Sequence, residues 1–173
     1  RTNTNTWTQS LSIYSLSRSG KFSSLNSNQA AGGAVPKYLT IEPTSIAKQF
    51  AEALDRDDFA AAESLLASEC VYEARAGEIM GATAIVSPYR EASAWAKDHL
   101  DSIQYASRVE DANESRAAII FIDHITHQGK SHSYQCQQLL SFGANGNIVR
   151  IQHVELPGQR EALNAFFATV GIA

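Results

Sequence analysis

The sequence predicts an α+β fold, in which a mostly antiparallel sheet carries its helices on one face. Three consecutive strands joined by tight turns are expected between residues 116 and 156, and apolar residues at helical spacing come before and after them. Strands joined by hairpins lie antiparallel, and such a sheet commonly buries one face under helices. A chain of 173 residues is long enough for one domain with a substantial core.

Residues 1–37 differ in composition from the rest of the chain. They are rich in serine, threonine and asparagine and contain no acidic residue. Such a segment has too little apolar surface to offset the entropy lost on ordering it. We expect a plain polar tail, with two alternatives open: an arm packed on another subunit, or a targeting remnant, since transit peptides are also serine-rich and poor in acids. The folded domain is expected over residues 38–173.

Two short helices are expected at the start of this domain. Thr44 or Ser45 can cap a helix that follows Pro43, and Asp57-Asp58 can end it and cap the next one. The apolar positions recur at helical spacing, with Ile46, Phe50, Ala53 and Leu54 in the first helix and Phe59, Ala62, Leu65 and Leu66 in the second. The two helices therefore form a hairpin with a very short joint.

A strand, a third helix and a second strand are expected next. Residues 70–74 read as a short strand that Gly77 and Gly81 end. Ser87-Pro88 is typical of a helix start, because serine can be the N-cap and proline misses no hydrogen bond at the first helical position. Residues 103–109 alternate between apolar and polar side chains, as in a half-buried strand.

The three consecutive strands are expected over residues 117–127, 131–142 and 147–155. Gln128-Gly129-Lys130 joins the first pair. The second turn, residues 143–146, ends in Asn-Gly before a β-branched run, which is a strong hairpin signal. A terminal helix over residues 159–170 completes the order of elements.

Four segments of this chain carry a resemblance to a known family. They are Ala-Leu-Asp-Arg-Asp-Asp-Phe at 53–59, the step from Leu-Leu at 65–66 to Val-Tyr at 71–72, Gly-Ala-Thr-Ala-Ile at 81–85 and Gly-Asn-Ile-Val-Arg-Ile at 146–151. In order and spacing, the chain resembles the nuclear transport factor 2-like superfamily in its SnoaL-like branch, from about residue 43 to residue 171. The resemblance implies a cone-shaped curved sheet wrapped by three helices from the N-terminal half and one C-terminal helix. It also implies a pocket at the open end and a homodimer formed through the outer face of the sheet.

The resemblance does not give the function. The superfamily includes ketosteroid isomerases, polyketide cyclases, dehydratases, epoxide hydrolases and members that only bind, so function has to be argued from the site. No catalytic set of those enzymes matches the residues of this chain in spacing.

Asp123 is the first candidate for chemistry, because it interrupts an apolar run at residues 119–125. A buried carboxylate has a raised pKa and can act as a general base near neutrality. The alternative is a structural ion pair with an arginine or histidine. Alternation puts Ile119, Phe121, Ile125 and His127 on the face of Asp123. In each of the next two strands it groups one set of side chains on one face: His132, Tyr134, Cys136, Gln138, Leu140 and Phe142 in the first, and Ile151, His153 and Glu155 in the second.

His132 and His153 are the next candidates, because they lie on neighbouring strands. With Asp123 or Glu155 orienting one of them, they could form a general-base pair. Tyrosines that could donate a hydrogen bond to a substrate oxygen are Tyr72, Tyr105 and Tyr134. The alternative is that the histidines are hydrogen-bonded structural residues. A metal site of both histidines and a carboxylate is less favoured, and we expect neither a metal nor a cofactor.

The apolar wall of the pocket is expected from helical residues and two strand residues. They are Phe50, Leu54, Tyr89 and Trp95, with Tyr105 and His124 as further lining. Aromatic residues at helical spacing are more often core, but a mostly apolar pocket can use the same side chains.

Composition excludes several classes of function. The formal charge of −4 and the lack of a basic stripe argue against a nucleic-acid surface. No apolar run is long enough to span a membrane, and Walker, GxSxG and GxGxxG motifs are absent. Two cysteines without a CxxC motif favour a reducing compartment. We therefore expect a cytoplasmic or organellar protein, with targeting left open.

Two functions remain. In the first, the chain binds a small apolar or aromatic ligand and acts on it as an isomerase, cyclase or dehydratase, with His132 or Asp123 as the base and Tyr72 or Tyr134 as the hydrogen-bond donor. In the second, it is a ligand-binding or dimerisation module without catalysis, and its histidines are structural. A homodimer is expected under both.

Overall fold

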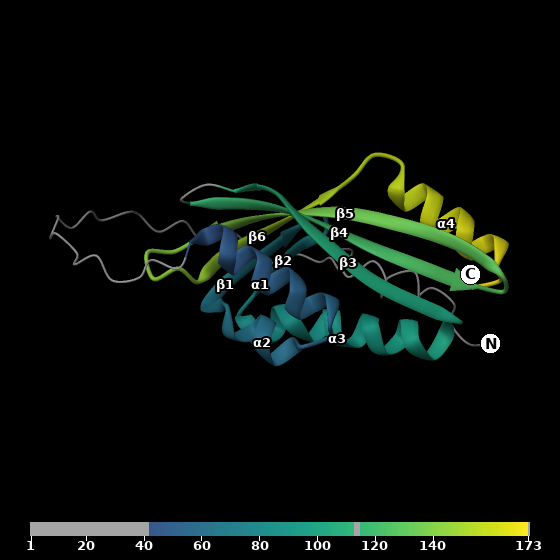
Figure 1. The fold of residues 1–173 in the computed structure, drawn as a ribbon, viewed down its shortest axis with the longest axis horizontal. Helices are drawn as coiled ribbons and strands as arrows, with labels where there is room; N and C mark the ends of the chain where they lie inside the picture. Colours follow the sequence, from purple (N-terminus) through teal and green to yellow (C-terminus); the bar gives the residue numbers. More distant parts are fainter. Residues whose placement is uncertain (1–41, 113–114, 173) are drawn as a thin grey trace, which may run out of the picture.

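A six-stranded sheet forms one layer of the molecule. The computed structural model describes residues 42–112 and 115–172, so the predicted N-terminal segment 1–37 lies outside the described residues. The strands stand in the order β2-β1-β6-β5-β4-β3 (Figure 1). Their bounds are β1 (Leu66–Ala74), β2 (Gly77–Met80), β3 (Ser102–Ala112), β4 (Arg116–His127), β5 (Lys130–Phe142) and β6 (Ile148–Glu155). Only the pair β1 and β6 is parallel, which confirms a mostly antiparallel sheet.

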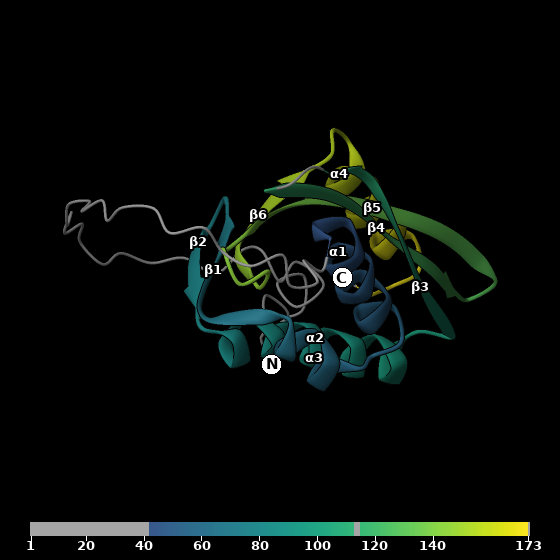
Figure 2. The ribbon, with the colours of Figure 1, turned by 60° about the vertical axis from the view of Figure 1, so that its left-hand side comes forward.

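The helices cover the inner face of this curved sheet. They are α1 (Pro43–Asp55), α2 (Phe59–Ser64), α3 (Ala82–His99) and α4 (Gln159–Thr169). In Figure 2 the sheet curves around α1, while α2 and α3 run along the open side and α4 lies at the far end. Contacts of α1 with β3 and β4, of α3 with β1 and β2, and of α4 with β5 agree with this view. The predicted α+β class is confirmed.

The two predicted hairpin turns are present. The first is one residue shorter than the predicted joint: Gln128 and Gly129, with φ values of +49° and +72°, form a two-residue connection between β4 and β5, and Lys130 belongs to β5. Positive φ at both central positions matches the right-handed twist of paired strands. At the second turn, Gly146 has a φ of +85° and its amide donates to the Gly143 carbonyl (2.9 Å).

The alternation predicted from the sequence is confirmed along the central strands. Ile119, Leu140 and Ile151 are fully buried, and each occupies an inner position of its strand. The register pairs Leu140 of β5 with Ile151 of β6, so the inner faces of neighbouring strands coincide. A one-residue slip would place these side chains in solvent, and burial of the inner face therefore fixes the register.

Three element predictions were wrong. Strand β2 was missed, since residues 77–80 were read as a break, and Leu66 belongs to β1 instead of to the second helix. Helix α3 begins at Ala82, five residues before Ser87, and keeps Pro88 inside it. Gly81 adopts a φ of +100°, and its carbonyl accepts from the Ile85 amide (2.9 Å), so the helix can start there. The Ser87 hydroxyl donates to Glu91 (3.0 Å) instead of capping a helix.

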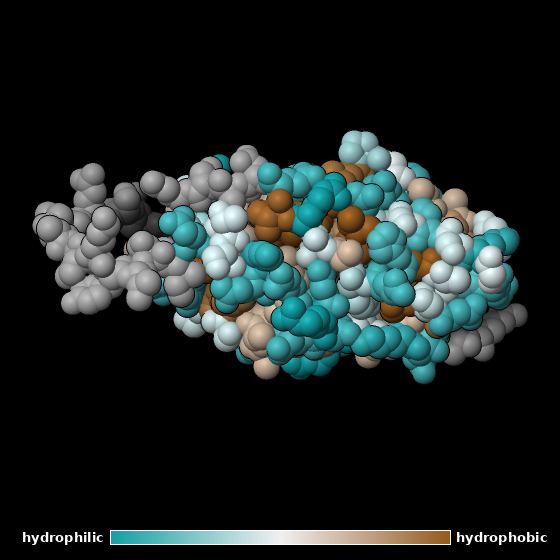
Figure 3. Space-filling view, viewed as in Figure 1, coloured by the Kyte–Doolittle hydropathy of each residue, from teal (hydrophilic) through white to brown (hydrophobic). Residues whose placement is uncertain are grey.

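The buried apolar side chains form two clusters. The larger one joins α1 and α3 to the inner faces of β1, β4, β5 and β6 around Phe50. The second lies under α4, where Trp95 packs edge-on against Phe167 at a centroid distance of 6.5 Å. On the face shown in Figure 3, apolar residues appear as separate patches between hydrophilic ones. The space between the two clusters is where the site lies.

Candidate functional site

A cavity of about 90 Å³ opens between helices α1, α2 and α3 and the inner faces of β3, β4 and β5. We call it the Asp123 cavity. Its lining is mostly apolar, with three carboxylates and three tyrosines among it: Leu54, Asp55, Asp57, Phe59, Tyr89, Ala92, Ser93, Tyr105, Ala106, Phe121, Asp123, Tyr134 and Cys136. A mostly apolar hollow with a few converging polar groups is the usual form of a small-molecule site.

Three side chains form a row across the floor of the cavity. The register places Tyr105 of β3 opposite Asp123 of β4, and Asp123 opposite Tyr134 of β5. Residues directly opposite one another on antiparallel strands have neighbouring side chains on the same face. Asp123 therefore stands between two tyrosines because of strand register alone, and no loop has to hold it there.

Burial, together with a smaller effect of the nearby Asp55 carboxylate, raises the pKa of Asp123 to about 7. Among the residues that the structure describes, no hydrogen bond or ion pair reaches the Asp123 carboxylate. The structural alternative, a salt bridge to arginine or histidine, is therefore not found in the described part of the chain. A desolvated carboxylate without a cation changes charge near neutral pH.

Asp55 and Asp57 come from the end of α1 and the turn after it. The Ser107 hydroxyl donates to Asp55 (2.5 Å), and Lys97 of α3 pairs with Asp57. Burial raises the pKa of Asp55, while the hydrogen bond from Ser107 opposes that rise. Two carboxylates with raised pKa values therefore lie close enough to influence each other.

The tyrosines of the cavity remain protonated at neutral pH. Burial raises the pKa of Tyr105 to about 12, and it also raises the pKa of Tyr134. A neutral phenol can donate a hydrogen bond to an oxygen that gains negative charge. Tyr89, on the helical wall, accepts a hydrogen bond from the Gln138 amide (2.7 Å), and burial raises its pKa as well.

Five of the predicted site residues line the Asp123 cavity, and they come from helices as well as from strands: Leu54, Tyr89, Tyr105, Asp123 and Tyr134. Their roles stay predictions. Tyr72 does not line the cavity; it is buried behind Tyr89, with the two rings edge to face at 6.4 Å. Phe50 is fully buried in the larger cluster.

The histidines lie elsewhere. His132 stacks on Phe166 of α4 at a centroid distance of 5.3 Å, and burial lowers its pKa. His153 is buried on β6, and its burial and the nearby Arg160 lower its pKa to about 3. Neither lines the Asp123 cavity, and Trp95 packs in the α4 cluster instead. The structure therefore separates Asp123 from the pair of histidines that was expected to share its pocket.

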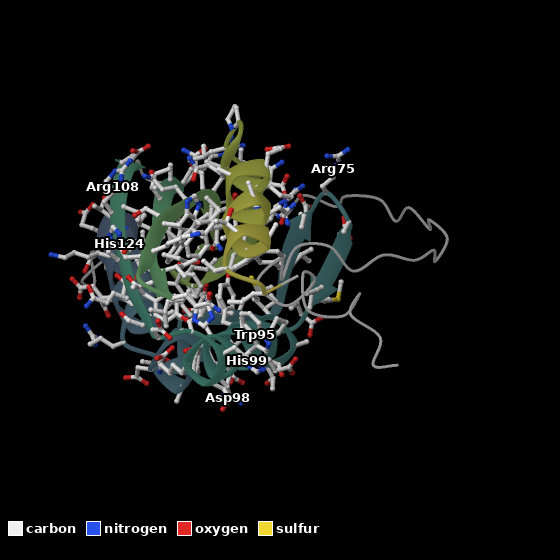
Figure 4. All side chains as sticks on the ribbon, turned by 90° about the vertical axis from the view of Figure 1, so that its right-hand side faces the viewer. Arg75, Trp95, Asp98, His99, Arg108 and His124 are labelled. Carbon is white, nitrogen blue, oxygen red and sulfur yellow. The ribbon has the colours of Figure 1, made fainter. Side chains whose placement is uncertain are left out.

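His124 lies on the opposite, outer face of β4. Its side chain is exposed, and its Nδ1 shares a hydrogen bond with the Ser133 hydroxyl (2.9 Å). Figure 4 shows His124 and Arg108 together at one flank, well away from Trp95 at the lower edge of the fold. The prediction that His124 lines the pocket is corrected, because a strand directs successive side chains to opposite faces.

Several cavity residues were not predicted. Phe121 and Cys136 share the inner face with Asp123, so the alternation already placed them there. Ser93 follows Tyr89 by four residues on α3, the spacing that puts two side chains on one helix face. Asp55 and Asp57 lie at the end of α1. No local sequence pattern shows that this end of the helix packs toward the sheet.

Residues 42–112 and 115–172 contain no group of three or more histidine, cysteine, aspartate or glutamate side chains arranged to hold a metal ion. Within the same ranges, no helix is long and apolar enough to cross a membrane.

Known proteins match this chain in structure but not in sequence. No protein-family model matches it, and no curated protein does. A candidate polyketide cyclase from Xanthomonas campestris is 18% identical, with a TM-score of 0.54 over 74% of this chain and 96% of that one. An epoxide hydrolase from Mycobacterium tuberculosis, described as LEH-like, is 14% identical, with a TM-score of 0.53 over 76% and 96%.

A third similar structure is described only by its fold. It is an NTF2-like protein of unknown function from Cytophaga hutchinsonii, 15% identical, with a TM-score of 0.50 over 68% of this chain and 93% of that one. These likenesses cover nearly the full length of the other proteins, at identities that show the fold alone. The described residues form a curved six-stranded sheet with four helices, and the chain has the nuclear transport factor 2-like fold that the resemblance in its sequence implied.

Proposed function

We propose that this chain binds a small molecule in the Asp123 cavity and transfers protons on it without a cofactor, as an isomerase, cyclase or dehydratase does. The observation that carries the proposal is the row Tyr105–Asp123–Tyr134 on the cavity floor. It combines a proton acceptor with a pKa of about 7 and neutral hydroxyl donors on either side. A general base is most effective when its pKa lies near the working pH.

The chemistry that this row supports is proton transfer at a carbon beside a carbonyl group. The ionised Asp123 carboxylate takes the proton, and the electron pair of the broken C–H bond moves toward the carbonyl oxygen, which becomes an enolate. The hydroxyl of Tyr105 or Tyr134 donates to that oxygen and stabilises its charge. Asp123, now protonated, returns the proton at another carbon in an isomerisation, or to a departing hydroxyl in a dehydration.

A reaction that needs only a base in an apolar pocket tests this proposal without knowledge of the natural ligand. The probe is 5-nitrobenzisoxazole, whose C–H proton is removed by a base as its N–O bond breaks, releasing a coloured nitrophenolate. We expect turnover that rises with pH through about 7, as Asp123 ionises. Asp123→Asn should lower kcat/KM by about 100-fold or more, the usual contribution of general-base catalysis.

The matched control is Asp98→Asn. Asp98 is the same residue type on the solvent side of α3, with its side chain 81% exposed (Figure 4). It should leave kcat/KM and its pH profile unchanged. Equal turnover in the wild-type chain and Asp123→Asn would contradict the assignment of Asp123 as the base.

The second candidate is a binding module without catalysis. It is favoured by the size of the cavity, since about 90 Å³ is smaller than the roughly 150 Å³ of an engineered cavity that holds benzene. A ligand larger than a few atoms would then occupy the opening as well as the interior. Binding of the benzisoxazole without any elimination would support this candidate.

The expected homodimer remains a prediction of its own. Leu139 of β5 is 37% exposed and lies on the outer face of the sheet, because its neighbours Gln138 and Leu140 are buried on the inner face. Burying such a side chain against a second copy would stabilise a dimer. We expect a dimer in sedimentation at micromolar concentration, and a shift toward monomer for Leu139→Glu. A monomeric wild-type chain would contradict the prediction.

A further inference from the structure

The charges that line the Asp123 cavity have one sign. Asp55, Asp57 and Asp123 contribute carboxylates, and the described lining residues include no lysine, arginine or histidine. Lys97 pairs with Asp57, but its side chain is 57% exposed and does not line the cavity. The Asp55 carboxylate makes Asp123 harder to ionise, and no cation is among the causes that shift the pKa of Asp123.

Aromatic rings form much of the remaining wall. Phe59, Tyr89, Tyr105, Phe121 and Tyr134 come from two helices and three strands and face one small space. The face of an aromatic ring is electron-rich and attracts cations. One ring of this wall already has such a contact, since the Arg90 guanidinium lies 5.5 Å from the centroid of Phe59.

A buried hydroxyl of the lining lacks a hydrogen-bond partner. Ser93 is only 6% exposed, and its Oγ makes no hydrogen bond among the described residues. The Ser93 side chain also lies close enough to the Tyr105 hydroxyl to lower the pKa of that phenol. An unsatisfied buried hydroxyl is costly, and a bound N–H group would satisfy it.

From this combination we infer that the ligand of the Asp123 cavity carries a protonated amine. The ammonium group lies among the carboxylates of Asp55 and Asp123, the Ser93 hydroxyl and the aromatic faces, and the rest of the ligand extends through the opening. The inference rests on the proposed function to the extent that both place the ligand in this cavity.

The other charge classes of ligand fit less well. An anionic ligand would add a further negative charge beside Asp55 and Asp123, in a region where solvent screens charge poorly. A neutral ligand would leave the repulsion between the two carboxylates in place. A cation removes that repulsion, and the cavity volume of about 90 Å³ accommodates a small charged group.

The experiment compares three probes of similar shape and different charge: benzylammonium, benzyl alcohol and benzoate. Dissociation constants are measured by NMR titration of the full chain at pH 8, where Asp123 is ionised. We expect benzylammonium to bind about tenfold tighter than benzyl alcohol, the range of a carboxylate contact combined with a cation–π contact. Benzoate should not bind. Asp55→Asn and Asp123→Asn should each weaken benzylammonium binding about tenfold, and Asp98→Asn should leave it unchanged.

The outcomes separate this inference from the proposed function. If benzylammonium and benzyl alcohol bind with equal affinity while the chain still catalyses the benzisoxazole elimination, the inference that the ligand carries a protonated amine is wrong. The proposed acid–base function is then unaffected. If benzylammonium binding depends on Asp55 and Asp123 but the chain does not catalyse the benzisoxazole elimination, the result supports an amine ligand and contradicts the catalytic role of Asp123. Affinity for benzylammonium that neither variant changes would overturn the inference, because the probe would then bind outside the cavity.

Discussion

At pH values above 7, the Asp123→Asn variant is expected to have a higher free energy of unfolding than the wild-type chain. In the folded chain the pKa of Asp123 is about 7, against 3.8 for a free aspartate, and this difference corresponds to roughly 4 kcal/mol. The physical cause is desolvation, because ionising a carboxylate inside the cavity removes it from the water that stabilises the charge. Since the cavity opens to solvent, we expect a measured gain of roughly 2–4 kcal/mol.

The sign of this effect follows from the protons bound in each state. Between pH 4 and pH 7 the folded chain holds the Asp123 proton and the unfolded chain has lost it, so this group's contribution to stability falls as pH rises. Asparagine cannot ionise, and it resembles the protonated acid in shape. Urea unfolding at several pH values should therefore give nearly equal stabilities near pH 4 and a difference that grows up to pH 8.

The matched control is again Asp98→Asn, whose stability profile should parallel that of the wild-type chain. Parallel profiles for Asp123→Asn as well would contradict the raised pKa, and with it the main support for Asp123 as a base. The expected result has a functional meaning. A variant that gains stability while it loses turnover shows a residue kept for its chemistry at a cost to the fold.

Much of the sheet could be predicted from the sequence, because strand signals are local. Period-two alternation sorted the side chains of β4 into two faces, and the turn signal at residues 128–130 predicted the antiparallel pairing of β4 with β5. The row Tyr105–Asp123–Tyr134 comes from the structure, which shows the register of three neighbouring strands and which face of the sheet is inward. The short strand β2 was missed, because a four-residue segment between two glycines shows no clear period.

The rest of the site depends on packing, which no local pattern contains. The position of Asp55 is set by how α1 lies across β3, where Ser107 reaches its carboxylate. His132 was predicted on the correct face of β5, but α4 covers that end of the sheet and stacks Phe166 on it. Alternation gives the face of a strand, and only the tertiary structure shows which side chains a helix covers and which line a cavity.

His153→Gln is expected to gain stability relative to the wild-type chain as pH falls, whereas Asp123→Asn gains it as pH rises. In the folded chain the pKa of His153 is about 3, since burial disfavours its charged form and Arg160 repels it, whereas a free histidine has a pKa near 6.5. Below pH 6.5 the unfolded chain binds a proton that the folded chain does not, so the contribution of His153 to stability falls as pH falls. By pH 4.5 the loss is roughly 3 kcal/mol.

Glutamine stays neutral at every pH, so His153→Gln should unfold with a smaller loss of stability between pH 7.5 and pH 4.5. The readout is this difference within one variant, because a packing change from the new side chain contributes equally at both pH values. His124→Gln, at an exposed histidine of the outer face, is the control and should keep the wild-type difference.

The pH ranges over which Asp123 and His153 change the free energy of unfolding overlap. In the wild-type chain the two effects therefore largely cancel. As pH falls from 7 to 4, the folded state gains from protonation of Asp123 and loses from the neutral His153 by a similar amount. The Asp123→Asn, His153→Gln double variant should then resemble the wild-type profile more closely than either single variant does. A double variant whose pH dependence follows one single variant would show that only one of the two groups has a shifted pKa.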